Sequence, residues 1–381
     1  MTLRAPRADA IVIGAGMVGA ACAEALVRGG WRVLILEEGF LGGGATGAAM
    51  GHLVAMDDSP AQLALTAYSL RLWRAMRPEL PLDAEELSCG TLWIAEHEAQ
   101  LRALVERRQA YAMAGVRSEI LDAIALAEAE PALRPGLAGA LLVPDDSVVY
   151  PPAVARWLIG RACAHGAELR EQVRVTRVES RAAFTTDGRY DADLVVIASG
   201  CQAPALVPEL RILPRKGHLI VTDRYPRFCR HQLVETGYLE SAHDMNSASV
   251  AFNLQPRSTG QLLLGSSREL SGWDASLNRE IVSAMIARAT HFVPALQRVQ
   301  ALRVWTGFRP ATADGLPFIG AWPMLDGVWV AAGHEGLGIT TALGTAQLLA
   351  DLLADRQPAI DVAPYAPDRQ SHAVHHGLAH A

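Results

Sequence analysis

The sequence has few cysteines, and none of them has a metal-binding spacing. Its 381 residues include only five, and no two are spaced as Cys-x-x-Cys. An odd, scattered set in a chain of this length argues against a disulfide framework and against a zinc or iron–sulfur site ligated by cysteines of this chain. We predict no metal site, a cytoplasmic location, and cysteines that serve as small buried hydrophobic residues. They are Cys22, Cys89, Cys163, Cys201 and Cys229.

Long hydrophobic runs and an excess of positive charge are also missing. The longest apolar runs, such as residues 194–198, are far shorter than the roughly 18 residues of a transmembrane helix, and residues 1–10 lack a signal-peptide pattern. The formal net charge is −6 with scattered Arg and Lys, which argues against a nucleic-acid-binding protein. Half of the residues are hydrophobic, which excludes a disordered chain. The length predicts roughly two or three structural units.

The N-terminal region has the pattern of a βαβ unit. A short β-branched strand at 10–13 leads into a glycine-rich turn, an Ala-rich helix at 20–28 and a second strand at 31–36, which Glu37 closes. A G-x-G-x-x-G turn between strand and helix, with an acid about 20 residues further on, is typical of a dinucleotide-binding site. A glycine-rich turn in another kind of α/β unit is the alternative, and the motif alone does not distinguish FAD from NAD.

Each residue of this motif has a physical role. Gly14 permits a tight turn, Gly16 lets the backbone approach a pyrophosphate, and Gly19 lets the helix and the strand pack closely. The helix N-terminus offers free N–H groups and the positive end of the helix dipole to the anion. The carboxylate of Glu37 is expected to accept hydrogen bonds from a ribose diol.

A second glycine-rich segment follows the acid. Residues 39–52 read GFLGGGATGAAMGH and show neither strand nor helix periodicity. Small side chains let the backbone lie against a flat ligand, whereas a linker is expected to carry more Ser, Pro or charge. A flavin needs such a segment because its ring system extends beyond the pyrophosphate, and an NAD-binding fold does not. His52 either faces the flavin ring or, as is more common for a lone histidine, is structural.

The middle of the chain is predicted to complete the first unit. Amphipathic helices are expected at 59–78 and 96–115, and a further helix at 152–166. A strand at 172–178 precedes the segment DADLVVIASG at 191–200, whose apolar run suits a buried parallel strand that ends at the cofactor. The dinucleotide-binding domain is therefore expected to be discontinuous in sequence.

Residues 213–310 have a different pattern, which predicts an antiparallel sheet in a second domain. Apolar strands alternate here with turns rich in Gly, Pro and Ser. Asn253, Gln255 and Arg268 interrupt these strands, and they face either a cavity or the solvent-exposed side of the sheet. The expected strands lie at 213–222, 249–256, 260–267 and 303–310.

The C-terminal region repeats the arrangement of the first motif. A strand at 328–332, the loop GHEGLG at 333–338 and a helix from Ile339 follow one another. The N-terminus of this helix offers a second positive dipole end, which suits the electron-rich edge of a reduced flavin.

Together these motifs resemble the D-amino acid oxidase/glycine oxidase superfamily of FAD-dependent oxidoreductases. The matching segments are GAGMVG, LEEG, GGGATGAAMGH, DLVVIASG, WTGFRPATADGLPFIG and GHEGLGITTALGTAQLLADLL. The resemblance implies an α/β plus α+β fold, in which a discontinuous Rossmann-like FAD-binding domain carries an antiparallel-sheet substrate-binding domain over the flavin. It also implies that the protein oxidises an amino acid or an amine.

The resemblance assigns contacts with FAD residue by residue. The first motif matches the pyrophosphate and ribose contacts, the second glycine-rich segment matches the wall beside the flavin ring, and the C-terminal loop matches the pyrimidine end of that ring. The implied positions are Gly14, Gly16, Gly19, Glu37, Glu38, Ala45, Thr46, Ala49, Met50, Gly51, His52, Val175, Ser199, Gly200, Gly333, Gly336, Leu337, Gly338, Ile339 and Thr340.

The substrate site is expected to depend on three residues. Arg309 in GFRP matches the arginine that clamps the substrate carboxylate in many members, and a structural ion pair is its alternative role. Asn253 stands about where simple oxidases often have an aromatic residue that closes the site, and Asn253 and His52 are candidates for shaping it. No catalytic base is expected, because an amine can enter the site neutral and catalysis is then mostly orientation.

The segment GGGATGAAMGHLVAMDDSPAQLALTAYS at 42–69 looks closer to the β subunits of heteromeric, dye-linked amino-acid dehydrogenases. That group is similar to D-hydroxyproline dehydrogenase, octopine and nopaline oxidases and hydrogen cyanide synthase. Such a subunit holds FAD and the substrate, a D-amino acid such as D-hydroxyproline, while partner subunits carry further redox centres. Membrane association then runs through the partners. Two alternatives are a stand-alone FAD oxidase of glycine, sarcosine or D-amino acids that produces hydrogen peroxide, and a non-catalytic flavin-fold binding protein.

We expect the two domains to alternate along the chain. FAD-binding parts are expected at 1–80, 141–212 and 311–365, a mainly helical part of the substrate domain at 81–140, and its antiparallel part at 213–310. Residues 366–381 are expected to form a flexible tail. Its clustered histidines, which alternatively bind metal, are His372, His375, His376 and His380.

Overall fold

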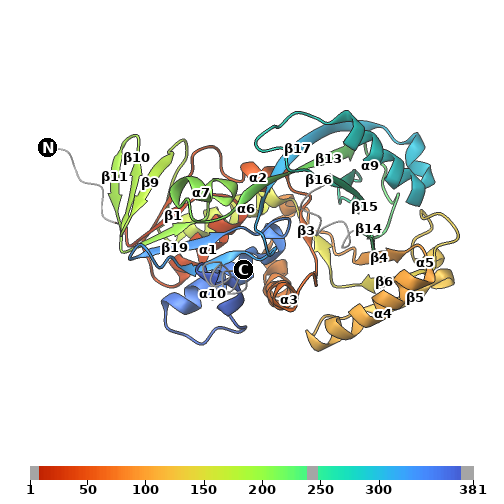
Figure 1. Ribbon diagram of the computed structural model, residues 1–381, viewed down its shortest axis with the longest axis horizontal. Coiled ribbons are helices and arrows are strands. Elements are labelled where there is room, and N and C mark those ends of the chain that lie inside the picture. Colours follow the sequence, from red (N-terminus) through yellow and green to blue (C-terminus); the bar gives the residue numbers. More distant parts are fainter. Residues whose placement is uncertain (1–7, 238–247, 370–381) are drawn as a thin grey trace, which may run out of the picture.

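The computed structural model of the protein describes residues 8–237 and 248–369. A six-stranded and an eight-stranded β-sheet form its two halves, with helices packed against each (Figure 1). Smaller sheets of three and two strands complete the fold. The histidine-rich segment 370–381 lies outside the described residues, so the structure does not test its predicted flexibility.

The six-stranded sheet has the strand order β18-β19-β12-β1-β2-β8. Neighbouring strands are parallel except for the antiparallel pair β18 and β19. The central strands are runs of Ile, Val, Leu and Ala that are buried along their whole length, as expected of parallel strands covered on both faces. Its strands are β1 (Ala10–Ile13), β2 (Val33–Leu36), β8 (Glu168–Arg170), β12 (Leu194–Ile197), β18 (Phe318–Ala321) and β19 (Val328–Ala332).

Closely packed helices cover this sheet. α1 (Met17–Arg28) contacts both α10 (Gly338–Leu353) and α6 (Pro151–Ala164), and α10 also contacts α3 (Pro60–Met76). Small residues make the close approach possible. A Cβ added at Gly344 of α10 would lie only 2.2 Å from the Ser69 Oγ of α3.

The eight-stranded sheet has the order β17-β13-β16-β15-β14-β4-β6-β5. α9 (Arg279–Phe292) packs on β15 and β16, where Phe252 stacks on Phe292 with 4.6 Å between ring centroids. The sheet is antiparallel except that β14 and β4 run parallel, which corrects the expectation of a wholly antiparallel sheet. Its strands are β4 (Thr91–Ala95), β5 (Glu119–Asp122), β6 (Gly139–Val143), β13 (Leu213–Thr222), β14 (Gln232–Glu235), β15 (Ser249–Pro256), β16 (Leu262–Arg268) and β17 (Ala301–Ala311).

The segment 81–140, expected to be mainly helical, supplies α4 (Glu98–Met113) and α5 (Ala123–Ala129) but also β4, β5 and the start of β6. These three strands are only four or five residues long, so their periodicity in the sequence is weak. At the chain's other end, Arg369 donates hydrogen bonds to both carboxylate oxygens of Asp314, so the beginning of the expected tail is attached to the fold.

Two small sheets lie outside the two large ones. β9 (Val175–Glu179), β10 (Ala182–Thr185) and β11 (Gly188–Asp191) form an antiparallel sheet, and β3 (His52–Leu53) pairs with β7 (Ser147–Val148). All five cysteines are free. Only Cys22 and Cys229 are buried, whereas Cys89 and Cys201 are partly exposed and Cys163 is exposed, which corrects the expectation that all are buried. No helix within 8–237 and 248–369 is long and apolar enough to cross a membrane.

Candidate active site

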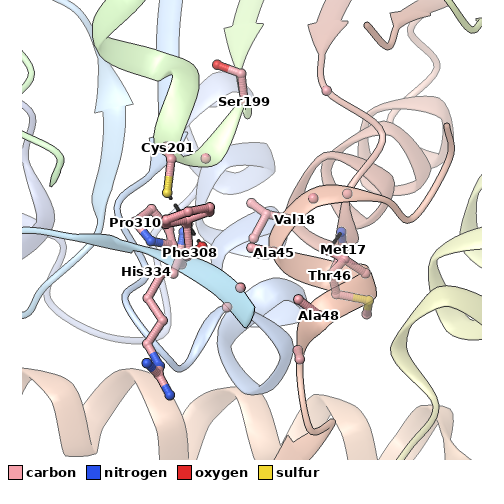
Figure 2. Close-up of a pocket in the computed structure, with 18 of the residues that line it drawn as sticks. Met17, Val18, Ala45, Thr46, Ala48, Ser199, Cys201, Phe308, Pro310 and His334 are labelled. Atoms are coloured by element: carbon pink, nitrogen blue, oxygen red, sulfur yellow. Dashed lines mark hydrogen bonds between the residues drawn. The ribbon is translucent and has the colours of Figure 1, made fainter. Parts of the chain in front are cut away.

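A cavity of about 460 Å³ is lined by both halves of the molecule. Figure 2 shows Met17, Val18 and Thr46 on one side of it, with Cys201, Phe308 and Pro310 on the opposite side. The residues of the first group belong to α1 and α2 (Gly44–Ala48), which follow strands of the six-stranded sheet, and Phe308 and Pro310 belong to β17 of the eight-stranded sheet. The cavity therefore lies between the two halves of the molecule, and each half supplies part of its wall.

The first glycine motif forms one end of the cavity, and its geometry requires glycine. Gly14 has a φ of +106°, and a Cβ added there would lie 2.7 Å from the Ala198 carbonyl oxygen. A Cβ at Gly19 would lie 2.0 Å from the Gly14 carbonyl oxygen, in agreement with a packing role for Gly19. The helix also begins earlier than predicted, at Met17, because Gly16 is its N-cap residue.

Two side chains hold this turn in place. The Met17 N–H donates a hydrogen bond of 2.9 Å to Thr46 Oγ1, which joins the start of α1 to α2. The Glu37 carboxylate accepts hydrogen bonds from the N–H groups of Ala15, at 2.7 Å, and Gly39, at 2.8 Å. Glu37 also lines the cavity, so a fixed carboxylate stands at the end of β2 where a ribose diol is expected.

The segment 48–50 packs against glycines of the eight-stranded sheet. A Cβ at Gly307 of β17 would lie 2.5 Å from the Ala48 Cβ, and one at Gly265 of β16 would lie 2.9 Å from the Met50 Sδ. The Trp305 indole N–H donates a hydrogen bond of 3.2 Å to the Ala48 carbonyl oxygen. Sequence reasoning missed these partners because the pairing lies between segments more than 200 residues apart.

Arg309 lines the cavity from β17, and its position depends on a glycine in the neighbouring strand. Its Nη1 donates a hydrogen bond of 2.9 Å to the Ser267 carbonyl oxygen. A Cβ at Gly217 of β13 would lie 2.3 Å from that Nη1 and 2.8 Å from Nη2. Within the described part of the chain, no salt bridge of 4.0 Å or less joins Arg309 to a carboxylate. Its alternative role as a structural ion pair therefore finds no partner among these residues.

Glu335 is a largely buried carboxylate whose charge interacts with that of Arg309. Burial raises the pKa of this carboxyl, but Arg268, Arg309 and Arg215 outweigh burial and hold it below its usual value. Its Oε1 lies 3.7 Å from Arg268 Nε and 3.8 Å from Arg215 Nη1. Glu335 is thus an ionised group among three arginines, and it was not predicted from the sequence.

His52 and Asn253 both line the cavity. Each has a buried polar atom, His52 Nε2 and Asn253 Oδ1, without a hydrogen-bond partner among residues 8–237 and 248–369. Burial lowers the pKa of His52 to about 4, with further lowering by Arg257 and Arg309, so the ring is neutral at pH 7. Asn253, Gln255 and Arg268 are all buried, which rules out the solvent-exposed side of the sheet for these three. Unpartnered buried polar atoms fit a site that a ligand completes.

The predicted cofactor-binding residues converge on this cavity with a few exceptions. Gly19, Gly333, Leu337 and Thr340 do not line it. Thr340 instead donates a hydrogen bond of 2.9 Å to the His52 carbonyl oxygen, and a Cβ at Gly333 would lie 2.7 Å from Thr312 Cγ2. The remaining predicted positions and all three predicted substrate residues line the cavity, and their contacts with FAD or substrate stay predictions.

Several lining residues were missed by sequence reasoning. Phe308 and Pro310 belong to the quoted WTGFRP segment, so that motif contained the signal for them. Trp273 comes from an irregular loop with no such signal, and its ring lies 5.3 Å from that of Phe308. The missed residues include Met17, Val18, Cys201, Trp273, Phe308, Pro310 and Glu335. No cluster of His, Cys, Asp and Glu suited to a metal ion occurs among residues 8–237 and 248–369.

The features of the cavity fit FAD. Its backbone approaches closely at Gly14, a helix begins beside it, and a fixed carboxylate lies at the end of β2, all of which suit the dinucleotide part. The wall of small residues at 43–51 and the orphan atoms of His52 and Asn253 suit a flat ring and a polar substrate.

Comparisons with known proteins agree with this fit. A family described as "FAD dependent oxidoreductase" matches residues 9–352. The chain is 31% identical over 380 residues to the glycine oxidase of Geobacillus kaustophilus, covering 95% of this chain and 97% of the relative. It is 33% identical over 312 residues to a D-amino acid dehydrogenase of Chromohalobacter salexigens, covering 77% and 70%.

Solved structures show the same architecture. The crystal structure of the Geobacillus kaustophilus glycine oxidase has a TM-score of 0.85 and 30% identity, covering 96% of this chain and 99% of that one. An L-proline dehydrogenase from P. horikoshii has a TM-score of 0.88 at 21% identity, which supports the fold alone. The chain belongs to the DAO family of FAD-dependent oxidoreductases, so its cofactor is FAD.

Proposed function

We propose that this protein oxidises the Cα–N bond of an amino acid or secondary amine and delivers the electrons to FAD. The observation that carries the proposal is Arg309, whose guanidinium lines the cavity without a carboxylate partner among the described residues. A planar guanidinium can donate two parallel hydrogen bonds to a carboxylate. The names of the relatives, glycine oxidase and D-amino acid dehydrogenase, support an amino acid as the substrate.

The residues that would hold FAD are those around the glycine motif, Glu37, the segment 43–52 and the loop 333–339. When bound, FAD supplies the acceptor for a hydride from the substrate carbon. Arg309 binds the substrate carboxylate and orients the adjacent Cα–H, while its bond to the Ser267 carbonyl oxygen fixes the guanidinium. Neutral His52 offers an acceptor to the substrate amine. When the substrate is a primary amine, water hydrolyses the released imine to a keto acid and ammonia. When the substrate is a secondary amine, the imine itself is the released product.

The reduced flavin can pass its electrons either to partner subunits or to oxygen, and we propose partner subunits. As the FAD-holding subunit of a heteromeric dehydrogenase for a D-amino acid such as D-hydroxyproline, the chain passes electrons to partner subunits, and any membrane association runs through them. The resemblance of the second glycine-rich segment to such subunits supports this proposal. As a stand-alone oxidase, the chain passes electrons to oxygen and makes hydrogen peroxide, and its whole-length likeness to glycine oxidases supports that alternative. We do not propose a non-catalytic role, because the family is one of oxidoreductases.

An anaerobic titration of the purified, FAD-loaded protein tests the proposal. The flavin absorbance is followed while D- and L-amino acids, D-hydroxyproline, glycine and sarcosine are added without oxygen. Bleaching by one of them supports the reaction, and a flavin that stays oxidised with the whole panel contradicts it. When air is admitted, fast recolouring with peroxide identifies an oxidase, and slow recolouring with rapid dye reduction identifies a dehydrogenase.

A further inference from the structure

A second cavity of about 340 Å³ adjoins the first. His52, Asn253, Glu335 and Gly336 line both, so they form the boundary between the two spaces. The predicted cofactor contacts surround the first cavity, and apart from this boundary only Leu337 among them lines the second. The second cavity therefore lies beyond the place where the substrate carbon meets the flavin.

The register of the eight-stranded sheet explains how this cavity is built. Four residues form a row across four neighbouring strands. Gly265 on β16 pairs with Asn253 on β15, and Asn253 pairs with Val234 on β14. Val234 in turn pairs with Trp93 on β4. Directly paired residues project from the same face of a sheet, and neighbouring strands lie about 4.8 Å apart. Because Gly265 faces Met50 beside the expected flavin ring, this row runs away from the flavin in three steps.

The charged groups that line the second cavity balance one another. Arg215 and Arg268 carry two positive formal charges, and Glu335 and Asp58 carry two negative ones. Asp314 also lines it, and its carboxylate is bonded to Arg369. The second cavity thus has no net charge that an ionised substrate side chain could neutralise. In the first cavity, Arg309 adds one positive charge, which a single substrate carboxylate neutralises.

The polar groups along the row include one acceptor and one donor that have no hydrogen-bond partner in the described part of the chain. Asn253, which is 4% exposed, has an unpartnered Oδ1, and Trp93, which is 1% exposed, has an unpartnered indole N–H. The rest of the row and the facing wall contribute apolar side chains, namely Val54, Met56, Val234 and Leu337. A hydroxyl or a carboxamide carries both a donor and an acceptor, so it can pair with either atom. Asn253 and Trp93 lie two strands apart, so the length of the side chain decides which of the two it reaches.

We propose that the second cavity binds the side chain of the substrate, and that the preferred substrate is an amino or imino acid with one carboxylate and a neutral polar side chain. This inference rests on the proposed function and adds the substrate class. Glycine leaves the cavity and both orphan atoms unused, and an acidic or basic side chain adds an unbalanced buried charge.

Matched substrate pairs test the inference in the anaerobic flavin assay with the FAD-loaded protein. Glutamine is compared with norleucine and with glutamate, and 4-hydroxyproline with proline, each in every available stereoisomer. We expect kcat/KM for the hydroxyl or carboxamide member to exceed that for its apolar or charged partner by about 10- to 100-fold. Glycine is expected to be a poorer substrate than the preferred member.

Two variants connect that preference to the cavity. Asn253→Leu keeps the branched shape of the side chain and removes the acceptor, and Trp93→Phe keeps an aromatic ring and removes the donor. We expect each to reduce the ratio of kcat/KM between pair members about tenfold or more, with the flavin spectrum unchanged. Trp322→Phe is the matched control, because Trp322 is also buried but lines neither cavity. It is expected to leave the ratio unchanged.

The results of these assays distinguish a failure of this inference from a failure of the proposed function. If glycine or an apolar amino acid reduces the flavin best, or if both variants leave the ratios unchanged, the inference is wrong while amino-acid oxidation stands. Val234→Phe tests the inference if the polar variants misfold. Its larger side chain fills the cavity, so we expect a lower ratio of kcat/KM for large substrates to kcat/KM for small ones. Val234→Ala is the control and is not expected to lower this ratio. If no amino or imino acid reduces the flavin, the proposed function fails and the inference fails with it.

Discussion

The two sheets contribute to the same cavity by different means. The six-stranded half presents mainly backbone, because Gly14 and the start of α1 bring main-chain groups to the cavity and Glu37 is fixed by two main-chain N–H groups. The eight-stranded half presents side chains, above all Arg309 and Asn253, whose positions depend on glycines or on cross-strand partners in neighbouring strands. The residues expected to bind the cofactor therefore lie within short stretches of the sequence. The positions of those expected to bind the substrate depend on which strands are neighbours in the sheet.

The largest expected effect tests the backbone half. Gly14→Ala places a Cβ 2.7 Å from the Ala198 carbonyl oxygen at a φ of +106°. Because the turn must open to relieve this clash, we expect the purified variant to hold less than about a tenth of the wild-type FAD. The ratio of flavin to protein absorbance measures it. Gly30→Ala is the control, since it has a φ of +88° but no atom within 4 Å, and it should retain its flavin.

The second prediction tests the side-chain half. Arg309→Gln removes the cation proposed to bind the substrate carboxylate, and we expect kcat/KM to fall about 100- to 1,000-fold with FAD content unchanged. Steady-state kinetics and flavin absorbance together give both numbers. Arg303→Gln, on the same strand but exposed, should have near-wild-type kinetics. A substrate affinity that is equal in Arg309→Gln and wild type would contradict the clamp.

The third prediction concerns a buried acid beside the eight-stranded sheet. Burial raises the pKa of Asp146 to about 8, against 3.8 in the unfolded chain. The folded state therefore holds a proton that the unfolded state loses, so the contribution of Asp146 to stability decreases as pH rises from about 4 to 8. Between pH 5 and pH 7, we expect the free energy of unfolding of the wild type to fall by about 3 kcal/mol relative to Asp146→Asn. Denaturant unfolding at several pH values measures the difference, and parallel curves for the two proteins would show that Asp146 is already ionised.

The fourth prediction concerns a glycine that acts on the side-chain half. Gly217→Ala leaves Arg309 in place in the sequence but puts a Cβ 2.3 Å from its Nη1. The displaced guanidinium should raise KM and lower kcat/KM about 10- to 50-fold, because a shift of about 1 Å misaligns the substrate. If Gly217→Ala has wild-type kinetics, the two strands adjust to each other and the register argument is weakened.

The smallest effect applies to a glycine without a structural demand. Gly160 lies inside α6 with no atom within 4 Å of an added Cβ and without a positive φ. Gly160→Ala should raise the free energy of unfolding by about 0.5–1 kcal/mol and leave kinetics unchanged, since alanine has the higher helix propensity. Thermal unfolding checks it. A destabilised variant would show that this helix face is less open than it is in the structure.

The sequence was most informative where a function depends on consecutive residues. The βαβ unit, its glycine roles and the discontinuous sheet were predicted, since the motif, the apolar runs and the acid lie within short segments. The strands β4 and β5 were not expected, and neither were the roles of Glu335, Trp93 and Gly217. The row that contains Trp93 depends on the pairing of β14 with β4, and the contact of Gly217 with Arg309 depends on the pairing of β13 with β17. Both pairings join segments about 90 to 140 residues apart, which leave no local pattern in the sequence.

The contact between Gly217 and Arg309 also limits how this protein can evolve. Any side chain gained at position 217 displaces the guanidinium, so a lineage that still depends on Arg309 keeps glycine there. Once Arg309 has been replaced, position 217 can change without further loss, and restoring arginine then requires glycine to return first. The order of substitutions is thereby constrained in both directions, and related sequences should seldom combine an arginine at 309 with a larger residue at 217.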